Sequence, residues 1–220
     1  MLFLLAAAVF GLALVPLLLV QSNVQGAQLP FRRPIVGSLY IAICIVGTVA
    51  VFYPGKCRMI IQKPNDSTIS EKPSASPVQF KGHHPDCDDF SGNRISIRGL
   101  VFCAACSGLL VGAIAAMVGA VLFSLGFFDL TTGSLWVLVV GDVLMILGLA
   151  QIKLRGYTKM AINALFVAGS LLILVVADLA KQSLFIDTYV LGLIVFMLWF
   201  RILLSEWHNK RICVACGRCI

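Results

Sequence analysis

The sequence contains few charged residues. Only 12% of its 220 residues are Asp, Glu, Lys or Arg, whereas 60% are hydrophobic. Soluble domains typically contain about 25% charged residues, so this chain has too few charges to cover a water-exposed surface. Its hydrophobic residues lie in long runs, and its mean hydropathy is +0.97. These features exclude a soluble domain, a disordered chain and a nucleic-acid-binding protein, and they predict a polytopic membrane protein in a lipid bilayer.

Common catalytic motifs are also missing from the sequence. It has no Gly-rich phosphate-binding loop, no His-Glu-x-x-His pair and no Ser/His/Asp set of the kind found in hydrolases. An enzymatic function therefore has no positive support, and we expect a non-enzymatic protein.

Six apolar runs meet or approach the length of about 20 residues that a transmembrane helix needs. The runs extend over Leu2–Val20, Ile35–Tyr53, Leu100–Phe128, Leu135–Ala150, Ala161–Ala180 and Leu184–Leu204. The third run is too long for a simple span, so we expect its first turns, around Cys103 and Cys106, at or above the membrane surface. The sequence therefore predicts an all-α membrane protein with six transmembrane helices.

The first run has an alternative interpretation as a cleaved signal peptide, because residues 24–26 resemble a small-residue cleavage site. However, no basic segment precedes this run, and it is longer than the apolar core of an ordinary signal peptide. We therefore favour a retained helix over cleavage of residues 1–26.

The basic residues are divided unequally between the two sides of the membrane that six spans create. All but three of the 17 Lys and Arg residues lie on the side of both termini, and the exceptions are Arg32, Arg33 and Lys181. The positive-inside rule places both termini in the cytoplasm of a cell-membrane protein. Every cysteine except Cys44 is on that side, where reducing conditions favour metal or redox chemistry over structural disulfides.

The chain divides into four parts by composition. These are two N-terminal transmembrane helices (1–53), a cytoplasmic loop (54–99), a four-helix transmembrane region (100–204) and a cysteine-containing cytoplasmic tail (205–220). Within the loop, the alternation of Ile95 and Ile97 predicts a short strand, and Gly99 predicts a turn.

A metal-binding pattern spans the end of the loop and the start of the third run. His84 and Cys87 have the two-residue gap of a metal knuckle, as do Cys103 and Cys106, and 15 residues separate the two pairs. Two such pairs joined by a loop of this size are typical of tetrahedral zinc sites. We therefore predict a zinc-knuckle-like loop, with His83 as the alternative to His84.

The same residues resemble a known family of small prokaryotic membrane proteins. The motifs His83-His84-Pro-Asp-Cys87-x2-Phe and Phe-Cys103-Ala-Ala-Cys106-Ser-Gly-Leu-Leu-x-Gly are similar to the family numbered 2085 among domains of unknown function. The resemblance extends over residues 80–119, and bacterial members place Cys before His where His83-His84 stand. It implies a membrane protein with a Cys/His cluster, in which Cys87, Cys103, Cys106, Gly108 and Gly112 match the family, and it implies no mechanism.

A second cysteine cluster lies near the end of the sequence. Cys213, Cys216 and Cys219 have the Cys-x2-Cys-x2-Cys spacing that begins a ferredoxin-type iron–sulfur run, but the fourth cysteine of that run is missing. Cys57 or His208 is the candidate for the fourth ligand. Zinc, Cu(I) and iron–sulfur clusters all bind to cysteine ligands, and we favour zinc. One alternative is that these thiols bind no metal. Another is that they form a single metal site together with the first cluster.

Two features lie inside the predicted spans. Small residues recur at Gly108, Gly112, Ala116 and Gly119 or Ala120, a spacing that lets another helix approach closely. Asp142 is an intramembrane carboxylate, with Asn163 and Thr188 as polar candidates at similar depth. We favour a hydrogen-bonded carboxylate that holds helices together over a proton or cation path.

Three functions are consistent with these patterns. The leading hypothesis is a membrane protein whose cytoplasmic zinc site is structural and forms a docking surface for a protein partner or a larger membrane complex. The second is a redox or electron-transfer protein with an iron–sulfur or thiol centre. The third is a metal-ion or proton-coupled transporter that uses Asp142.

Overall fold

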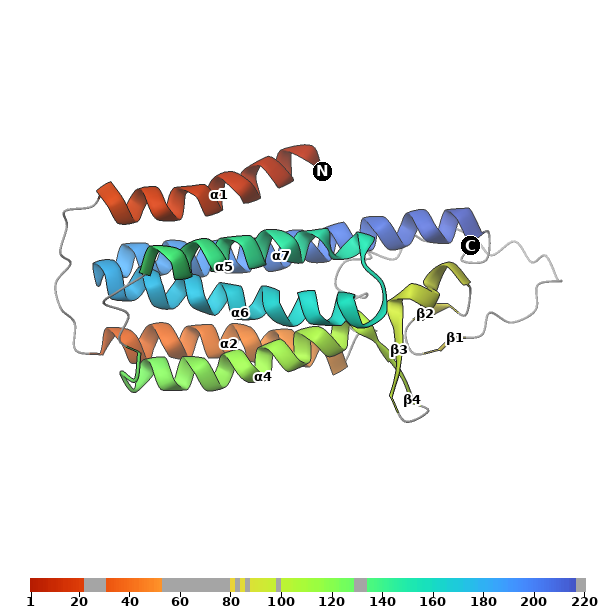
Figure 1. Cartoon of the computed structure of the whole chain (residues 1–220), viewed down its shortest axis with the longest axis horizontal. Coiled ribbons are helices and arrows are strands. Elements are labelled where there is room, and N and C mark those ends of the chain that lie inside the picture. Colours follow the sequence, from red (N-terminus) through yellow and green to blue (C-terminus); the bar gives the residue numbers. More distant parts are fainter. Residues whose placement is uncertain are drawn as a thin grey trace, which may run out of the picture.

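Six long helices form a bundle in the computed structural model of the chain (Figure 1). The structure describes residues 1–21, 31–52, 80–81, 84–85, 88–97, 100–128 and 134–216. The helices are α1 (Leu2–Gln21), α2 (Arg32–Phe52), α4 (Ala104–Ser124), α5 (Ser134–Leu149), α6 (Gly156–Lys181) and α7 (Leu184–Cys216). Each belongs to a segment that is long and apolar enough to cross a membrane, which confirms the expectation of a multi-pass helical protein.

Short elements join the helices at one end of the bundle. Strands β1 (Phe80–Lys81) and β2 (His84–Pro85) form one antiparallel pair, and β3 (Arg94–Ile97) and β4 (Leu100–Cys103) form another. The 3-10 helix η1 (Asp88–Asn93) precedes β3, and η2 (Ala150–Lys153) follows α5. The strand predicted from Ile95 and Ile97 is therefore confirmed, whereas Gly99 lies outside the described residues.

Three helix boundaries differ from the prediction. Residues 100–103 were expected in the third helix but form β4, because their backbone groups pair with β3. Helix α6 begins at Gly156, five residues before the predicted apolar run. Helix α7 continues through Cys216, so most of the segment 205–220, which was predicted as a cytoplasmic tail, is helical. The segment has no Gly or Pro before Gly217, and these are the two residues that most disfavour a helix.

Helix α6 lies at the centre of the bundle. It packs against α4 and α5, α2 packs on α4, and α7 packs against α6 and α1. Of the six spans, that of α6 has the largest buried share. Successive helices alternate in direction, so the starts of α4 and α6 lie with the strands at one end, which we call the hairpin end (Figure 1).

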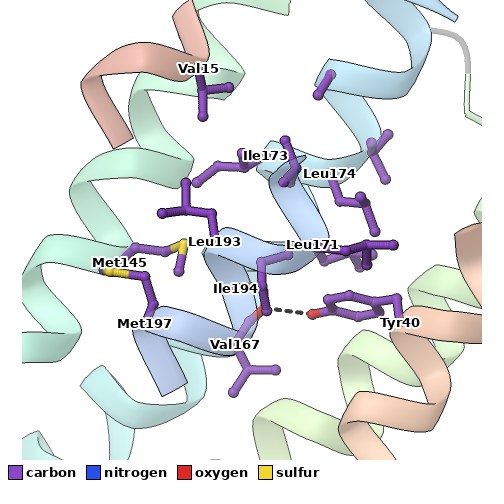
Figure 2. Packing of buried hydrophobic residues seen from close by; sticks show 14 of the residues in the cluster. Val15, Tyr40, Met145, Val167, Leu171, Ile173, Leu174, Leu193, Ile194 and Met197 are labelled. Atoms are coloured by element: carbon purple, nitrogen blue, oxygen red, sulfur yellow. Dashed lines mark hydrogen bonds between the residues drawn. The ribbon is translucent and has the colours of Figure 1, made fainter. Parts of the chain in front are cut away.

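The buried core between the helices is apolar, with a few paired polar groups. Figure 2 shows Met145, Ile173, Leu193 and Met197 packed between α5, α6 and α7. The Tyr40 hydroxyl is buried here, and it donates to the Val167 carbonyl at 3.1 Å. This bond satisfies a polar group that has no access to water in the bundle.

The small residues of α4 lie against α6, which confirms the packing interpretation of their spacing. A Cβ atom on Gly108 would lie 2.1 Å from the Met160 carbonyl oxygen, and one on Gly112 would lie 2.8 Å from the Cα of Ala164. Both obstacles are backbone atoms of α6, so the contact requires glycine at these two positions.

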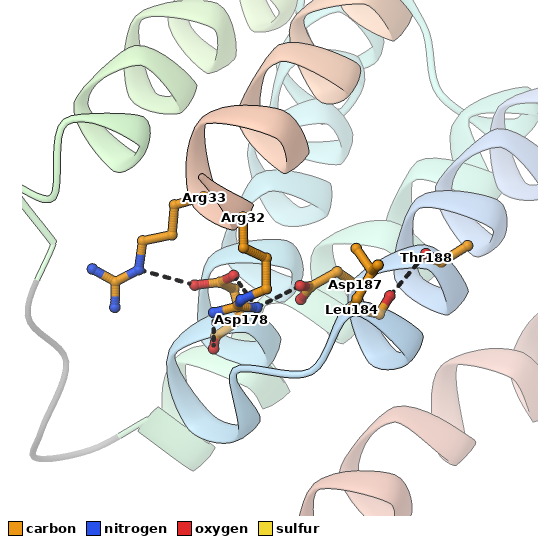
Figure 3. A network of polar contacts seen from close by, with 6 residues as sticks. All are labelled: Arg32, Arg33, Asp178, Leu184, Asp187 and Thr188. Atoms are coloured by element: carbon orange, nitrogen blue, oxygen red, sulfur yellow. Dashed lines mark hydrogen bonds and ion pairs between the residues drawn. The ribbon is translucent and has the colours of Figure 1, made fainter. Parts of the chain in front are cut away.

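Four side chains, three of them buried, form an ionic network at the opposite end, which we call the ion-pair end (Figure 3). Arg32, at the start of α2, lies 2.5 Å from carboxylate oxygens of both Asp178 and Asp187. Arg33 approaches the second oxygen of Asp178 at 3.3 Å but is about one-third exposed. The two carboxylates come from the end of α6 and the start of α7, so Arg32 joins three helices.

Gly108→Ala is expected to lower the free energy of unfolding by about 1–3 kcal/mol, because α4 and α6 must separate to accept the methyl group. Gly47→Ala is the matched control, because a Cβ there meets nothing within 4 Å. Thermal unfolding in detergent should show a lower midpoint for Gly108→Ala alone, and equal midpoints would contradict the packing.

Arg32→Gln is expected to cost about 3–5 kcal/mol of stability, because it leaves two buried carboxylates without their shared cation. Arg33→Gln should cost less than about 1 kcal/mol, since Arg33 is partly exposed and Asp178 retains Arg32. Denaturation in the same detergent compares the two variants. Similar losses in both would show that Arg32 is not the centre of the network.

Candidate functional site at the hairpin end

The Cys103–Cys106 pair lies where a strand becomes a helix. Cys103 is the last residue of β4, where it pairs with Arg94, and it is also the extended N-cap residue of α4. Cys106 lies in the first turn of that helix. Ile95, on the partner strand, is buried, and β3 contacts α6.

The two thiols contact each other. The side chains of Cys103 and Cys106 are hydrogen-bond partners, and both residues are partly buried. Neither is in a disulfide.

Two buried cations lie within electrostatic range of both thiols. Lys159 comes from the first turns of α6, and Arg201 comes from the second half of α7. Both side chains are almost completely buried. We call Cys103, Cys106, Lys159 and Arg201 the thiol–cation cluster.

Lys159 ties the loop to the bundle. Its Nζ donates to Asn93 Oδ1 at 2.6 Å, and Asn93 is the last residue of η1. A second contact supports the same attachment, because the Tyr157 hydroxyl donates to the Ser96 carbonyl at 2.9 Å. The start of α6 therefore holds η1 and β3 beside the thiol pair.

Arg201 is held by amide oxygens and an aromatic ring. Its Nη2 donates to Gln151 Oε1 at 2.8 Å and also to Asn163 Oδ1. Its guanidinium carbon lies 5.4 Å from the centre of the Phe166 ring. The buried Nε has no hydrogen-bond partner among the described residues. In the described part of the chain, the hydrogen-bond acceptors of Arg201 are neutral amide oxygens.

The structure brings together only part of each predicted metal site. In the first, Cys103 and Cys106 meet, while His83, Cys87 and the side chain of His84 lie outside the described residues. In the second, α7 contains Cys213 and Cys216, but their side chains, Cys57 and Cys219 lie outside them too. No group of three His, Cys, Asp or Glu side chains forms a metal-binding cluster in the described part of the chain.

His208, the alternative fourth ligand of the second site, lies near the thiol–cation cluster. It is two turns beyond Arg201 on α7 and within electrostatic range of Lys159. Residues seven apart share one face of a helix. The helix face that carries Arg201 therefore continues toward the C-terminal cysteines.

Asp142 has a different environment from the one expected. It is partly buried on α5, and its Oδ1 is buried with no hydrogen-bond partner in the described part. Thr188 donates to the Leu184 carbonyl, and Asn163 bonds to Lys159 and Arg201. The two polar candidates thus have other partners.

Lys159 and Arg201 do not stand out in the sequence, where they count only toward the basic side of the membrane. A signal was nevertheless present for Arg201, because this arginine lies inside the apolar run Leu184–Leu204, where a charge is costly to bury and requires a partner. Its partners Gln151 and Asn163 come from distant parts of the chain, so their identity depends on the packing of the helices.

No family model, curated protein or solved structure matches the chain. The resemblance to the family numbered 2085 therefore stays a prediction that depends on the motifs around Cys87 and Cys103. The chemistry of the thiol–cation cluster is the basis for inferring a function.

Proposed function

We propose that this is an integral membrane protein whose hairpin end binds zinc through Cys103, Cys106 and ligands from the preceding loop. The metal has a structural role: it fixes the loop to the start of α4 and thereby forms a docking surface for a protein partner. The observation that carries the proposal is the contact between the two thiols at the strand–helix junction.

The local geometry suits a metal site. Two sulfur ligands of a tetrahedral zinc ion lie about 3.8 Å apart, given Zn–S bonds of about 2.3 Å. The hydrogen bond between Cys103 and Cys106 places their two sulfur atoms next to each other. The N-terminus of α4 adds partial positive charge and backbone N–H groups, which stabilise thiolate ligands.

The remaining ligands are proposed from the adjacent loop. Cys87 directly precedes η1 in the sequence, and His84 belongs to β2. The contacts of Asn93 with Lys159 and of Ser96 with Tyr157 hold the following segment against the bundle. The described segment that follows Cys87 in the sequence is therefore held at the hairpin end, close to the Cys103–Cys106 pair.

The C-terminal cysteines support a second proposed thiol site. Cys213 and Cys216 are three residues apart in a continuous helix, so they lie on one face. Together with Cys219 and either Cys57 or His208, they are candidates for zinc or for an iron–sulfur cluster. The cluster would make the protein a redox carrier, which is the alternative function.

We propose that the hairpin end faces the cytoplasm. Every Lys and Arg except Arg32, Arg33 and Lys181 lies on that side of the six spans. This asymmetry follows the positive-inside rule. A reducing compartment would keep the cysteines available as ligands.

Metal analysis of protein purified without oxygen tests the proposal directly. We expect about one zinc ion per chain at the first site, lost when Cys103 and Cys106 are both changed to Ser. Cys44→Ala is the control, because Cys44 is buried within α2 and should leave zinc content unchanged.

Two results would contradict the zinc proposal. A brown preparation that contains iron and loses its visible absorbance in Cys213→Ser would favour the redox function. A metal-free preparation with intact thiols, or with a Cys103–Cys106 disulfide, would exclude a structural metal at the hairpin end.

A further inference from the structure

The net charge of the protein belongs to its hairpin end. With six spans, 14 of the 17 basic residues fall on that side of the membrane, together with six of the ten acidic residues, so the side carries a net charge of +8. The side of the ion-pair end has three residues of each sign and is neutral. The remaining acidic residue, Asp142, lies within a span, and the total is the formal charge of +7. Anionic lipid headgroups are therefore attracted to the hairpin end.

Two exposed cations lie directly before α6 at this end. Lys153 is the last residue of η2, and Arg155 is the extended N-cap residue of α6. A Cβ atom on Gly92 would lie 2.8 Å from Cγ and 3.0 Å from Cδ of Arg155, so the aliphatic part of this side chain packs on η1. Arg155 is nevertheless exposed. A cation that the fold holds in place loses less conformational entropy when it binds a ligand.

Aromatic residues mark the level of the membrane–water interface at the hairpin end. Tyr157, one turn before the apolar run of α6, is 61% exposed. Trp207, just beyond the apolar run of α7, is half-buried, and the guanidinium carbon of Arg211 lies 3.9 Å from the centre of its ring. Tyr and Trp are enriched where a transmembrane helix meets the headgroup region. The headgroups at this end therefore lie level with Tyr157, two residues from Arg155.

A mostly apolar stripe on α6 extends from Tyr157 into the membrane. Helix α6 has the largest buried share of the six spans, yet four residues of its first half are exposed, namely Tyr157, Thr158, Ala161 and Leu165. The last three are spaced by three and four residues, so they lie on one face of the helix. Residues 166–179 are all buried or half-buried, so the stripe ends near the middle of α6. At 1.5 Å per residue it is about 12 Å long, close to the roughly 15 Å of hydrocarbon in one leaflet.

We propose that the start of α6 binds an anionic phospholipid from the leaflet at the hairpin end. The phosphate group contacts Lys153 and Arg155, and an acyl chain lies along Ala161 and Leu165. Charge complementarity favours this occupant, because the hairpin end carries the net charge of the chain and the two cations lie at headgroup level. A soluble anion would match the cations but would leave the stripe uncovered. The inference does not depend on the zinc site, since none of these residues is a proposed metal ligand.

Native mass spectrometry of the full chain in a neutral detergent tests the proposal. The protein is titrated with phosphatidylglycerol and with phosphatidylcholine that has identical acyl chains. Phosphatidylglycerol should bind roughly 25-fold more tightly, from about 5-fold for each of the two cations. Lys153→Gln and Arg155→Gln should each weaken the binding of phosphatidylglycerol about 5-fold and leave that of phosphatidylcholine unchanged. Arg155→Lys keeps the charge and should retain most of the preference.

Lys181→Gln is the matched control, because it removes the same charge from the other end of α6. The helix separates Lys181 from Arg155 by about 39 Å, well beyond the distance over which salt screens exposed charges. This variant should change the affinity for phosphatidylglycerol less than about 2-fold. Lys153 and Arg155 are exposed, so their Gln variants should keep the thermal midpoint of the unaltered protein.

Glycerol 1-phosphate, added as a competitor, separates a lipid site from a site for soluble anions. It has the charged headgroup phosphate but no acyl chain, so it should not displace phosphatidylglycerol at equal concentration. Displacement at equal concentration would overturn the proposal. Equal affinities for the two lipids, or a preference for phosphatidylglycerol that persists when Lys153→Gln and Arg155→Gln are combined, would overturn it as well.

Discussion

A charge buried between apolar helices must be balanced or it destabilises the bundle, and this constraint shapes both ends of the molecule. At the ion-pair end, Arg32 is shared by Asp178 and Asp187 and joins three helices (Figure 3). At the hairpin end, Lys159 and Arg201 donate hydrogen bonds to side-chain amide oxygens. Helix α6 connects the two ends, because it carries Lys159 near its start and Asp178 near its end.

Much of the helical fold could be predicted from the sequence because its signals are periodic or local. Six apolar runs correspond to six long helices, and the spacing of Gly108 and Gly112 identified the face of α4 that packs on α6. The strand status of residues 100–103 could not be predicted, since a short apolar run before a helix looks the same in either conformation. Only pairing with β3 distinguishes the two.

The contact between the two thiols of the candidate site could be predicted from the sequence, but the partners of its buried cations could not. The Cys-x2-Cys spacing is local, so the sequence alone indicated that Cys103 and Cys106 would meet. Arg201 is 38 residues from Asn163 and 50 from Gln151, and Asp187 is 155 from Arg32. Contacts over such separations depend on how the helices pack, and a single sequence does not specify that arrangement. The partners of Arg201 and Arg32 could therefore be identified only from the structure.

The central proposal is that Cys103 and Cys106 bind a structural zinc ion at the hairpin end. Crystals grown without oxygen, with diffraction data collected on both sides of the zinc edge, would test it most directly. We predict an anomalous peak about 2.3 Å from the Sγ atoms of both Cys103 and Cys106. A disulfide between the two cysteines, or the absence of such a peak, would contradict it.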